Sequence, residues 1–209
     1  FSLPRSGSTL LQKIIASSDK VSTTSEPWIL LPLVHLRKKE GLVSEYSHKI
    51  SQMAIDDLEV ELLASRKSTI KDRINDLMSG IYKDLSDSNS IYFLDKTPRY
   101  YLIIKEIAEI FPESKFIFLF RNPLAQYASK ISIHKGRFKT LYSDFIDIKK
   151  GPSLLISAYE EFASRSIKVT YSELINNSEL IIAKLEKYLD IDINKTILQN
   201  LSKVKLKGA

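Results

Sequence analysis

The apolar run Lys115–Phe120 is the feature that most narrows the possible folds of this chain. It is apolar almost throughout, so it has no polar face to turn toward water. Such a run fits a strand that is covered on both faces, as in the middle of a parallel sheet. Pro123 follows it closely and is suited to begin a helix, which the pattern extends to His134. The sequence therefore predicts a buried central strand that leads directly into a helix.

Shorter strand signals alternate with helical patterns along the rest of the chain. They occupy residues 1–3, 21–24, 91–94 and 167–170, and helical patterns follow them at 9–16, 27–36, 99–110 and 178–189. This alternation predicts an α/β fold, a P-loop-like doubly wound parallel sheet flanked by helices.

Residues 41–88 differ from the rest of the chain because strand signals are absent there. Apolar residues recur at steps of three and four, which predicts two helices inserted as a cap beside the sheet. The 209 residues suit a single domain, 1–209, with this helical insertion at about 41–88 within it.

The turn Pro4–Thr9, between the first strand and the first helix, has the makings of a phosphate cradle. Backbone N–H groups at the start of a helix bind anions readily. A Walker A loop needs a glycine and a lysine where this chain has Ser2 and Ser8, and Arg5 lies two residues before Gly7 instead. The loop thus suits a phosphate-like group but lacks the lysine of an ATPase. The alternative is a plain turn whose serines cap the helix.

Three further polar residues come at predicted strand ends, namely Glu26, Lys96 and Arg121. The carboxyl ends of parallel strands meet at one edge of a sheet, so these residues and the loop are expected in one cleft. Each has a structural alternative. Glu26 would interact with the next helix dipole, Lys96 would pair with Asp95, and Arg121 would form a strand-end salt bridge.

These segments resemble those of the sulfotransferases that use 3′-phosphoadenosine 5′-phosphosulfate (PAPS). Pro4–Leu10 resembles their 5′-phosphosulfate loop, and Phe118–Pro123 together with Ser129 resembles their 3′-phosphate segment. Thr170–Leu174 resembles a later Tyr-x-x-Leu segment of the family. The spacings of Glu26 and Lys96 are similar to those of the tyrosylprotein sulfotransferase branch and its bacterial relatives.

The resemblance implies a role for each of these residues. Arg5 and the backbone of the loop, Ser6, Gly7, Ser8 and Thr9, would hold the 5′-phosphosulfate. Arg121 and Ser129 would bind the 3′-phosphate, and Tyr171 would contact the nucleotide. Lys96 and Arg5 would stabilise the bridging oxygen as the product PAP departs. Glu26 would be the general base, with His35 in reserve.

The reaction implied is transfer of a sulfuryl group from PAPS to a hydroxyl, or an amine, on a small-molecule, glycan or peptide acceptor. Two alternatives stay open. A P-loop nucleotide kinase or NTPase would need Mg²⁺ and a loop lysine, and a PAP- or PAPS-binding module would bind without turnover.

Composition excludes several other classes of function. The chain has no cysteine, which removes disulfides, thiolate catalysis and cysteine-based zinc sites, and the three histidines lack metal-ligand spacing. A net charge of +6 fits an anionic ligand or simply a lysine-rich surface. Basic residues are not interleaved with aromatics as in nucleic-acid-binding proteins, and no apolar run reaches membrane-spanning length. We therefore expect no metal, no nucleic acid and no membrane, with the oligomeric state open. Secretory members of the family that the chain resembles normally carry cysteines and membrane anchors, so the resemblance implies a cytoplasmic, bacterial protein.

Overall fold

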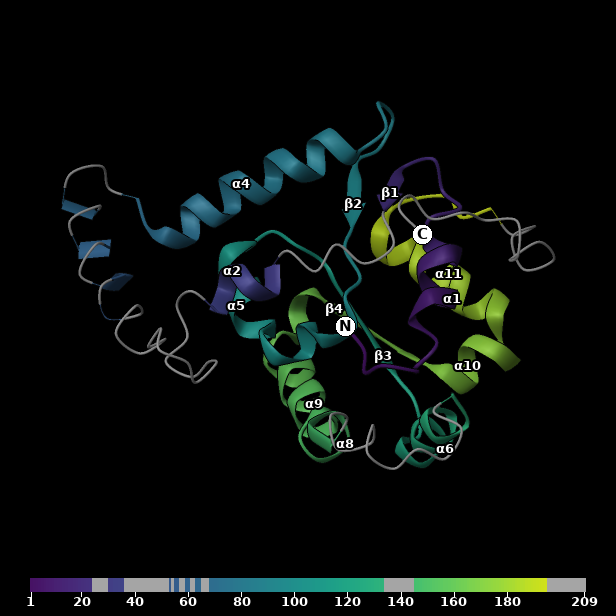
Figure 1. The fold of residues 1–209 in the computed structure, drawn as a ribbon. Helices are drawn as coiled ribbons and strands as arrows, with labels where there is room; N and C mark the ends of the chain where they lie inside the picture. Colours follow the sequence, from purple (N-terminus) through teal and green to yellow (C-terminus); the bar gives the residue numbers. More distant parts are fainter. Residues whose placement is uncertain are drawn as a thin grey trace.

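The computed structural model describes residues 1–23, 30–35, 68–133 and 145–194, and several single positions between 53 and 64. Within these ranges the chain is an α/β protein whose paired strands are all parallel (Figure 1). The predicted parallel α/β architecture is thus confirmed.

The strands form two parallel pairs. Strand β1 (Val21–Thr23) pairs with β2 (Tyr92–Leu94), and β3 (Phe116–Phe120) pairs with β4 (Ser166–Thr170). The N-terminal segment joins the other edge of β3 through a parallel bridge between Ser2 and Leu119. Residues 1–3, β3 and β4 therefore run side by side, and their carboxyl ends lie at one edge.

Helices cover both faces of β3, because its side chains alternate between two cores. Phe116 and Phe118 belong to a cluster with α5 (Ile104–Ile110) and α9 (Gly151–Glu161). Leu119 packs instead with α1 (Ser8–Ile15) and α11 (Ser178–Leu189), on the opposite side in Figure 1. This two-sided burial confirms β3 as a covered strand.

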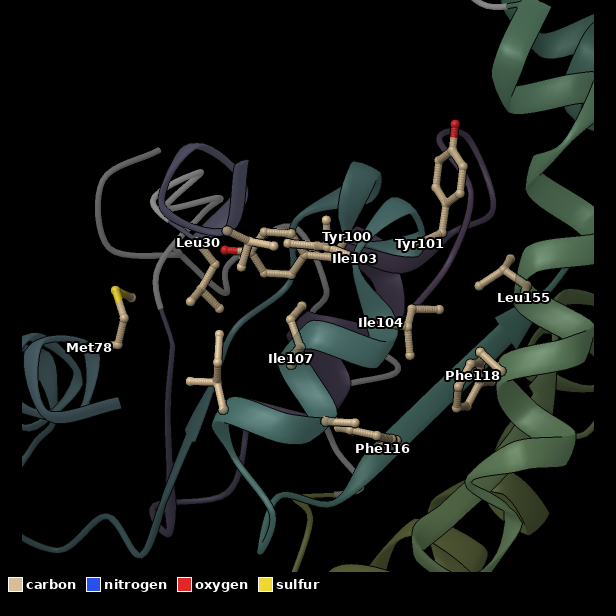
Figure 2. Packing of buried hydrophobic residues seen from close by; sticks show 14 of the residues in the cluster. Leu30, Met78, Tyr100, Tyr101, Ile103, Ile104, Ile107, Phe116, Phe118 and Leu155 are labelled. Atoms are coloured by element: carbon tan, nitrogen blue, oxygen red, sulfur yellow. The ribbon is translucent and has the colours of Figure 1, made fainter. Parts of the chain in front are cut away.

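The cluster that contains Phe116 and Phe118 also includes residues of three further helices (Figure 2). Its members include Leu30 on α2 (Leu30–His35), Met78 on α4 (Ile70–Leu85) and Tyr100 on the 3₁₀ helix η1 (Pro98–Leu102). The other described elements are α6 (Pro123–Ile133), α8 (Phe145–Lys149), the 3₁₀ helix η3 (Ala163–Arg165) and α10 (Tyr171–Asn176).

Helix boundaries follow local chemistry. Pro123 begins α6, and Thr69 and Thr170 begin α4 and α10 with capping boxes to Asp72 and Glu173. One predicted helix is divided in two. Ile103 has φ −136°, outside helical geometry, so η1 ends before it and α5 begins after it; its side chain is fully buried in the core.

The predicted insertion is described in part. Helix α4 is present, and Ile74 and Met78 are buried, but Leu77 and Leu85 on the predicted apolar stripe are 50% and 37% exposed. The first of the two predicted helices falls mostly outside the described residues. None of the helices within the described ranges is long and apolar enough to cross a membrane.

Candidate functional site

The loop between residues 1–3 and α1 has an unusual backbone. Arg5 has φ 66° and Gly7 has φ 88°, so two left-handed residues lie on either side of Ser6. Gly7 is the N-cap of α1 and has no side chain to cap it, and the first turn carries no acidic residue. The N–H groups and positive dipole at this helix start are therefore arranged to receive an anion.

Gly7 also allows close packing of an aromatic ring. A Cβ atom added to Gly7 would lie 2.5 Å from Cδ2 and 2.6 Å from Cε2 of Tyr171, the first residue of α10. Any side chain here would collide with the ring as well as strain the backbone. Glycine is thus required both for the turn and for contact with Tyr171.

A buried hydrogen bond that the sequence did not predict holds the loop to α6. Gln126 on α6 donates from Nε2 to the hydroxyl oxygen of Ser6, and both side chains are buried. In the sequence, Gln126 is one polar residue on an amphipathic helix, and nothing in its pattern distinguishes it from a surface residue.

Two arginines and a serine gather beside this loop. Arg121 donates from Nη1 to the carbonyl oxygen of Arg5 at 2.7 Å, and Arg5 Nε donates to Ser129 Oγ at 3.4 Å. The guanidinium of Arg121 also lies over the ring of Tyr171, 4.2 Å from its centroid. The structure thus brings together four residues, Arg5, Arg121, Ser129 and Tyr171, that the sequence assigned to one site.

This cluster is suited to a multi-oxygen anion. Arg121 Nε is buried, and within the described ranges it has no hydrogen-bond partner. Likewise, neither Arg5 nor Arg121 forms an ion pair with any carboxylate that the structure describes. Two uncompensated guanidinium groups beside a helix start favour a phosphate or sulfate ligand, because an arginine fork donates two parallel hydrogen bonds to such groups.

Lys96 comes two residues after the end of β2. It lines a cavity of about 560 Å³, which Ser8 at the start of α1 also lines. Residues of β2, β3, α1 and α4 contribute to the remaining wall. The structure therefore places Lys96 and the first residue of α1 around one space.

Other predicted residues are placed less fully. Thr9 is exposed in the first turn of α1, and His35 is the last residue of α2. Glu26 lies outside the described residues, so its predicted role as a base stays a prediction. The described residues contain no group of three or more histidine and carboxylate side chains that could hold a metal ion.

Comparisons with known proteins identify the family of the chain and its fold. A family model described as "Sulfotransferase family" matches residues 1–195. The nodulation protein NoeE of Sinorhizobium fredii (strain NBRC 101917 / NGR234) is 30% identical over 133 residues, which span 61% of this chain and 29% of NoeE.

Two solved structures resemble the fold. One is the sulfotransferase domain from the curacin biosynthetic pathway, with a TM-score of 0.61, 21% identity and coverage of 95% of this chain and 75% of that one. The other is the sulfotransferase domain of the Synechococcus PCC 7002 olefin synthase, with a TM-score of 0.58, 21% identity and coverage of 94% and 74%. Both likenesses show that the fold is shared.

Proposed function

The chain belongs to the sulfotransferase family, and from this premise we propose that it transfers a sulfuryl group from PAPS to a hydroxyl, or less readily an amine, on its acceptor. The observation that carries the proposal is the cluster of Arg5, Arg121 and Ser129 beside the glycine loop. It offers two guanidinium groups and a helix start to a ligand with separate anionic groups. PAPS has a phosphosulfate at one end and a 3′-phosphate at the other.

The two anionic groups of PAPS would bind at different places, the 5′-phosphosulfate at the loop and the 3′-phosphate beside it. The backbone N–H groups of Ser6 to Thr9 and the start of α1 would hold the 5′-phosphosulfate. Arg121 and Ser129 would hold the 3′-phosphate, and the buried Nε of Arg121 supports this role because it lacks a described partner. Arg5 would add its guanidinium to the 5′-phosphosulfate, while its backbone carbonyl accepts from Arg121 and its Nε donates to Ser129.

Lys96 would supply a positive charge near the bridging oxygen of PAPS. PAPS brings a sulfuryl group whose bond to the bridging oxygen breaks as a new S–O bond forms to the acceptor. Lys96 shares a cavity with Ser8, which supports a position near that bridging oxygen. A fixed positive charge there would stabilise the negative charge that develops on PAP.

A base must also accept the proton of the acceptor hydroxyl. We assign this role to Glu26, which the sequence places after β1, with His35 in reserve. A well-placed base contributes about 10²–10⁴-fold to a rate. We also propose one domain over 1–209, in which the helices at about 41–88 border a small-molecule, glycan or peptide acceptor. A metal is not required, since a sulfuryl group carries less negative charge than a phosphoryl group.

Ligand binding and turnover test the proposal separately. PAP should raise the melting temperature far more than AMP does, and equal shifts would contradict 3′-phosphate recognition. Radiolabelled PAPS incubated with a panel of phenols, sugars, hydroxylated lipids and peptides should then give a sulfated product, also in the presence of EDTA. PAP binding without transfer to any acceptor would indicate a binding module, and a metal requirement would favour the kinase alternative.

A further inference from the structure

Asp95 lies between β2 and Lys96, and three hydroxyl groups converge on its carboxylate. Tyr82 and Tyr100 both donate to Oδ2, the second at 3.0 Å, and Thr97 donates to Oδ1 at 3.4 Å. These donors come from α4, from η1 and from the segment that follows Lys96. The carboxylate therefore links the end of β2 to α4 and to η1.

The cluster is held in a largely apolar setting. Burial raises the pKa of Asp95, and this effect outweighs the hydrogen bonds and the nearby charge of Lys96, which lower it. Burial and the negative charge of Asp95 likewise raise the pKa of Tyr82 and of Tyr100 above that of an exposed tyrosine. The two phenols therefore stay protonated and remain donors to the carboxylate across the physiological range of pH.

The hydrogen bond between Thr97 and Asp95 spans Lys96. Thr97 is extended, with φ −120° and ψ 121°. The side chains of Asp95 and Thr97 meet across Lys96, and all three residues line the cavity that Ser8 also lines. Holding Asp95 and Thr97 together therefore fixes the backbone that carries Lys96 and limits the directions that its side chain can take.

Tyr82 ties this arrangement to the helical insertion. Its ring stacks on Phe93 of β2, with centroids 4.4 Å apart and an interplanar angle of 16°. Its hydroxyl donates a hydrogen bond to Asp95, the residue that follows Leu94. Helix α4 therefore holds both the end of β2 and the residue that precedes Lys96.

We propose that Asp95, held by Tyr82, Tyr100 and Thr97, is the positioning residue that directs Lys96 toward the donor site. The proposal rests on the proposed function, because it concerns the lysine of that reaction. Asp95 accepts three hydrogen bonds, which hold its carboxylate in one orientation. It acts through Lys96, and α4 supports it through Tyr82.

Binding of PAP to the full chain tests this role by calorimetry. If Lys96 contacts the 5′-phosphate, Lys96→Ala should weaken PAP binding roughly tenfold to a hundredfold, as expected for a charge-assisted hydrogen bond. Asp95→Asn should weaken it in the same direction by about threefold to tenfold. The double variant should bind no more weakly than Lys96→Ala alone, because the effect of Asp95 passes through Lys96.

A second pair of variants keeps the test decisive if Asp95→Asn fails to fold. Tyr82→Phe removes one donor to Asp95 and keeps the ring on Phe93, so PAP binding should weaken. Tyr92→Phe is the matched control: it also removes a tyrosine hydroxyl bond, from Tyr92 to the carbonyl oxygen of Leu189, but does not touch Asp95. Its PAP affinity should equal that of the wild type.

The outcomes separate the two proposals. Failure of the wild type to bind PAP would overturn the proposed function and this inference with it. If the wild type binds PAP and Lys96→Ala weakens binding, additive losses in the double variant would overturn the positioning role alone. Wild-type affinity for PAP in both Asp95→Asn and Tyr82→Phe would also overturn the positioning role. Non-additive losses of PAP affinity in the double variant would support the positioning role.

Discussion

Arg121 and Arg5 are joined by a hydrogen bond from the guanidinium Nη1 of Arg121 to the carbonyl oxygen of Arg5, at 2.7 Å. Arg121 follows β3 and Arg5 follows the N-terminal segment, so the bond ties together the carboxyl ends of two adjacent strands. It also supports the backbone of a loop residue that has a positive φ. Arg121 therefore shapes the loop, in addition to the ligand contact that we propose for it.

Replacing Arg121 by lysine should separate charge from geometry. Lysine keeps the positive charge but cannot donate to Arg5, stack on Tyr171 and bind a phosphate at once. We expect Arg121→Lys to weaken PAP binding at least tenfold while AMP binding changes little, as measured by calorimetry. Arg73→Lys on the exposed surface of α4 is the control. Equal losses for PAP and AMP would contradict a role at the 3′-phosphate.

Variants of Tyr171 distinguish a nucleotide contact from a supporting ring. The structure places the ring against Gly7 and under Arg121, so the ring and not the hydroxyl is what those contacts use. Tyr171→Phe should keep PAP affinity within about twofold, and Tyr171→Leu should lower it severalfold through loss of a cation–π contact worth about 1 kcal/mol. A large loss in Tyr171→Phe would instead indicate that the hydroxyl contacts the nucleotide.

Two glycines should respond in opposite ways to the same substitution. Gly7→Ala forces a Cβ onto a backbone with φ 88° and into the ring of Tyr171, so it should destabilise the fold by roughly 1–3 kcal/mol and abolish PAP binding. Gly80→Ala, in the interior of α4 with open space around it, should stabilise by about 0.5–1 kcal/mol. Urea denaturation measures both, and a neutral Gly7→Ala would show that the loop is not strained there.

Gln126 should matter for stability because it holds the loop through Ser6. Gln126→Leu removes the described donor to the buried hydroxyl of Ser6, which should cost about 1–3 kcal/mol. Adding Ser6→Ala to Gln126→Leu should recover part of the lost stability, because it removes the hydroxyl oxygen that Gln126→Leu leaves without its donor. Urea denaturation of the single and double variants gives the coupling, and strictly additive losses would count against this anchor.

The capping box of α10 should make stability depend on acidic pH. Hydrogen bonds from the side chain and backbone of Thr170 hold the pKa of Glu173 below its usual 4.5. A carboxylate with a lowered pKa stabilises the fold above the unfolded value, and this contribution is lost as pH falls through the folded value. Urea denaturation from about pH 6 to pH 3 should therefore show a shallower decline in Glu173→Gln than in the wild type.

The sequence predicted those parts of the fold that local patterns determine. The apolar run 115–120 became β3, because only a strand covered on both faces tolerates such a run. Pro123 marked the start of α6 correctly, since proline fits a first helical turn. Arg5, Arg121 and Ser129 also came together as expected, because the carboxyl ends of adjacent parallel strands share an edge.

Contacts between distant elements could not be predicted in the same way. The burial of Gln126 depends on how α6 packs under the loop, which no local pattern records. Tyr171 was expected to contact the nucleotide. Its ring also lies between Gly7 and Arg121, and this depends on how α10 packs against the loop. The break at Ile103 could not be predicted either, because residues 99–110 contain no glycine or proline to mark it.

The donor site draws its residues from nearly the whole length of the chain, from Arg5 to Tyr171. During synthesis, the loop therefore leaves the ribosome long before Arg121 and Tyr171 exist to support it. Since a ligand stabilises only the state that binds it, PAP cannot help a nascent chain to fold until α10 has emerged. A fragment that ends before β4 should gain no protection from PAP against proteolysis, however well its own helices form.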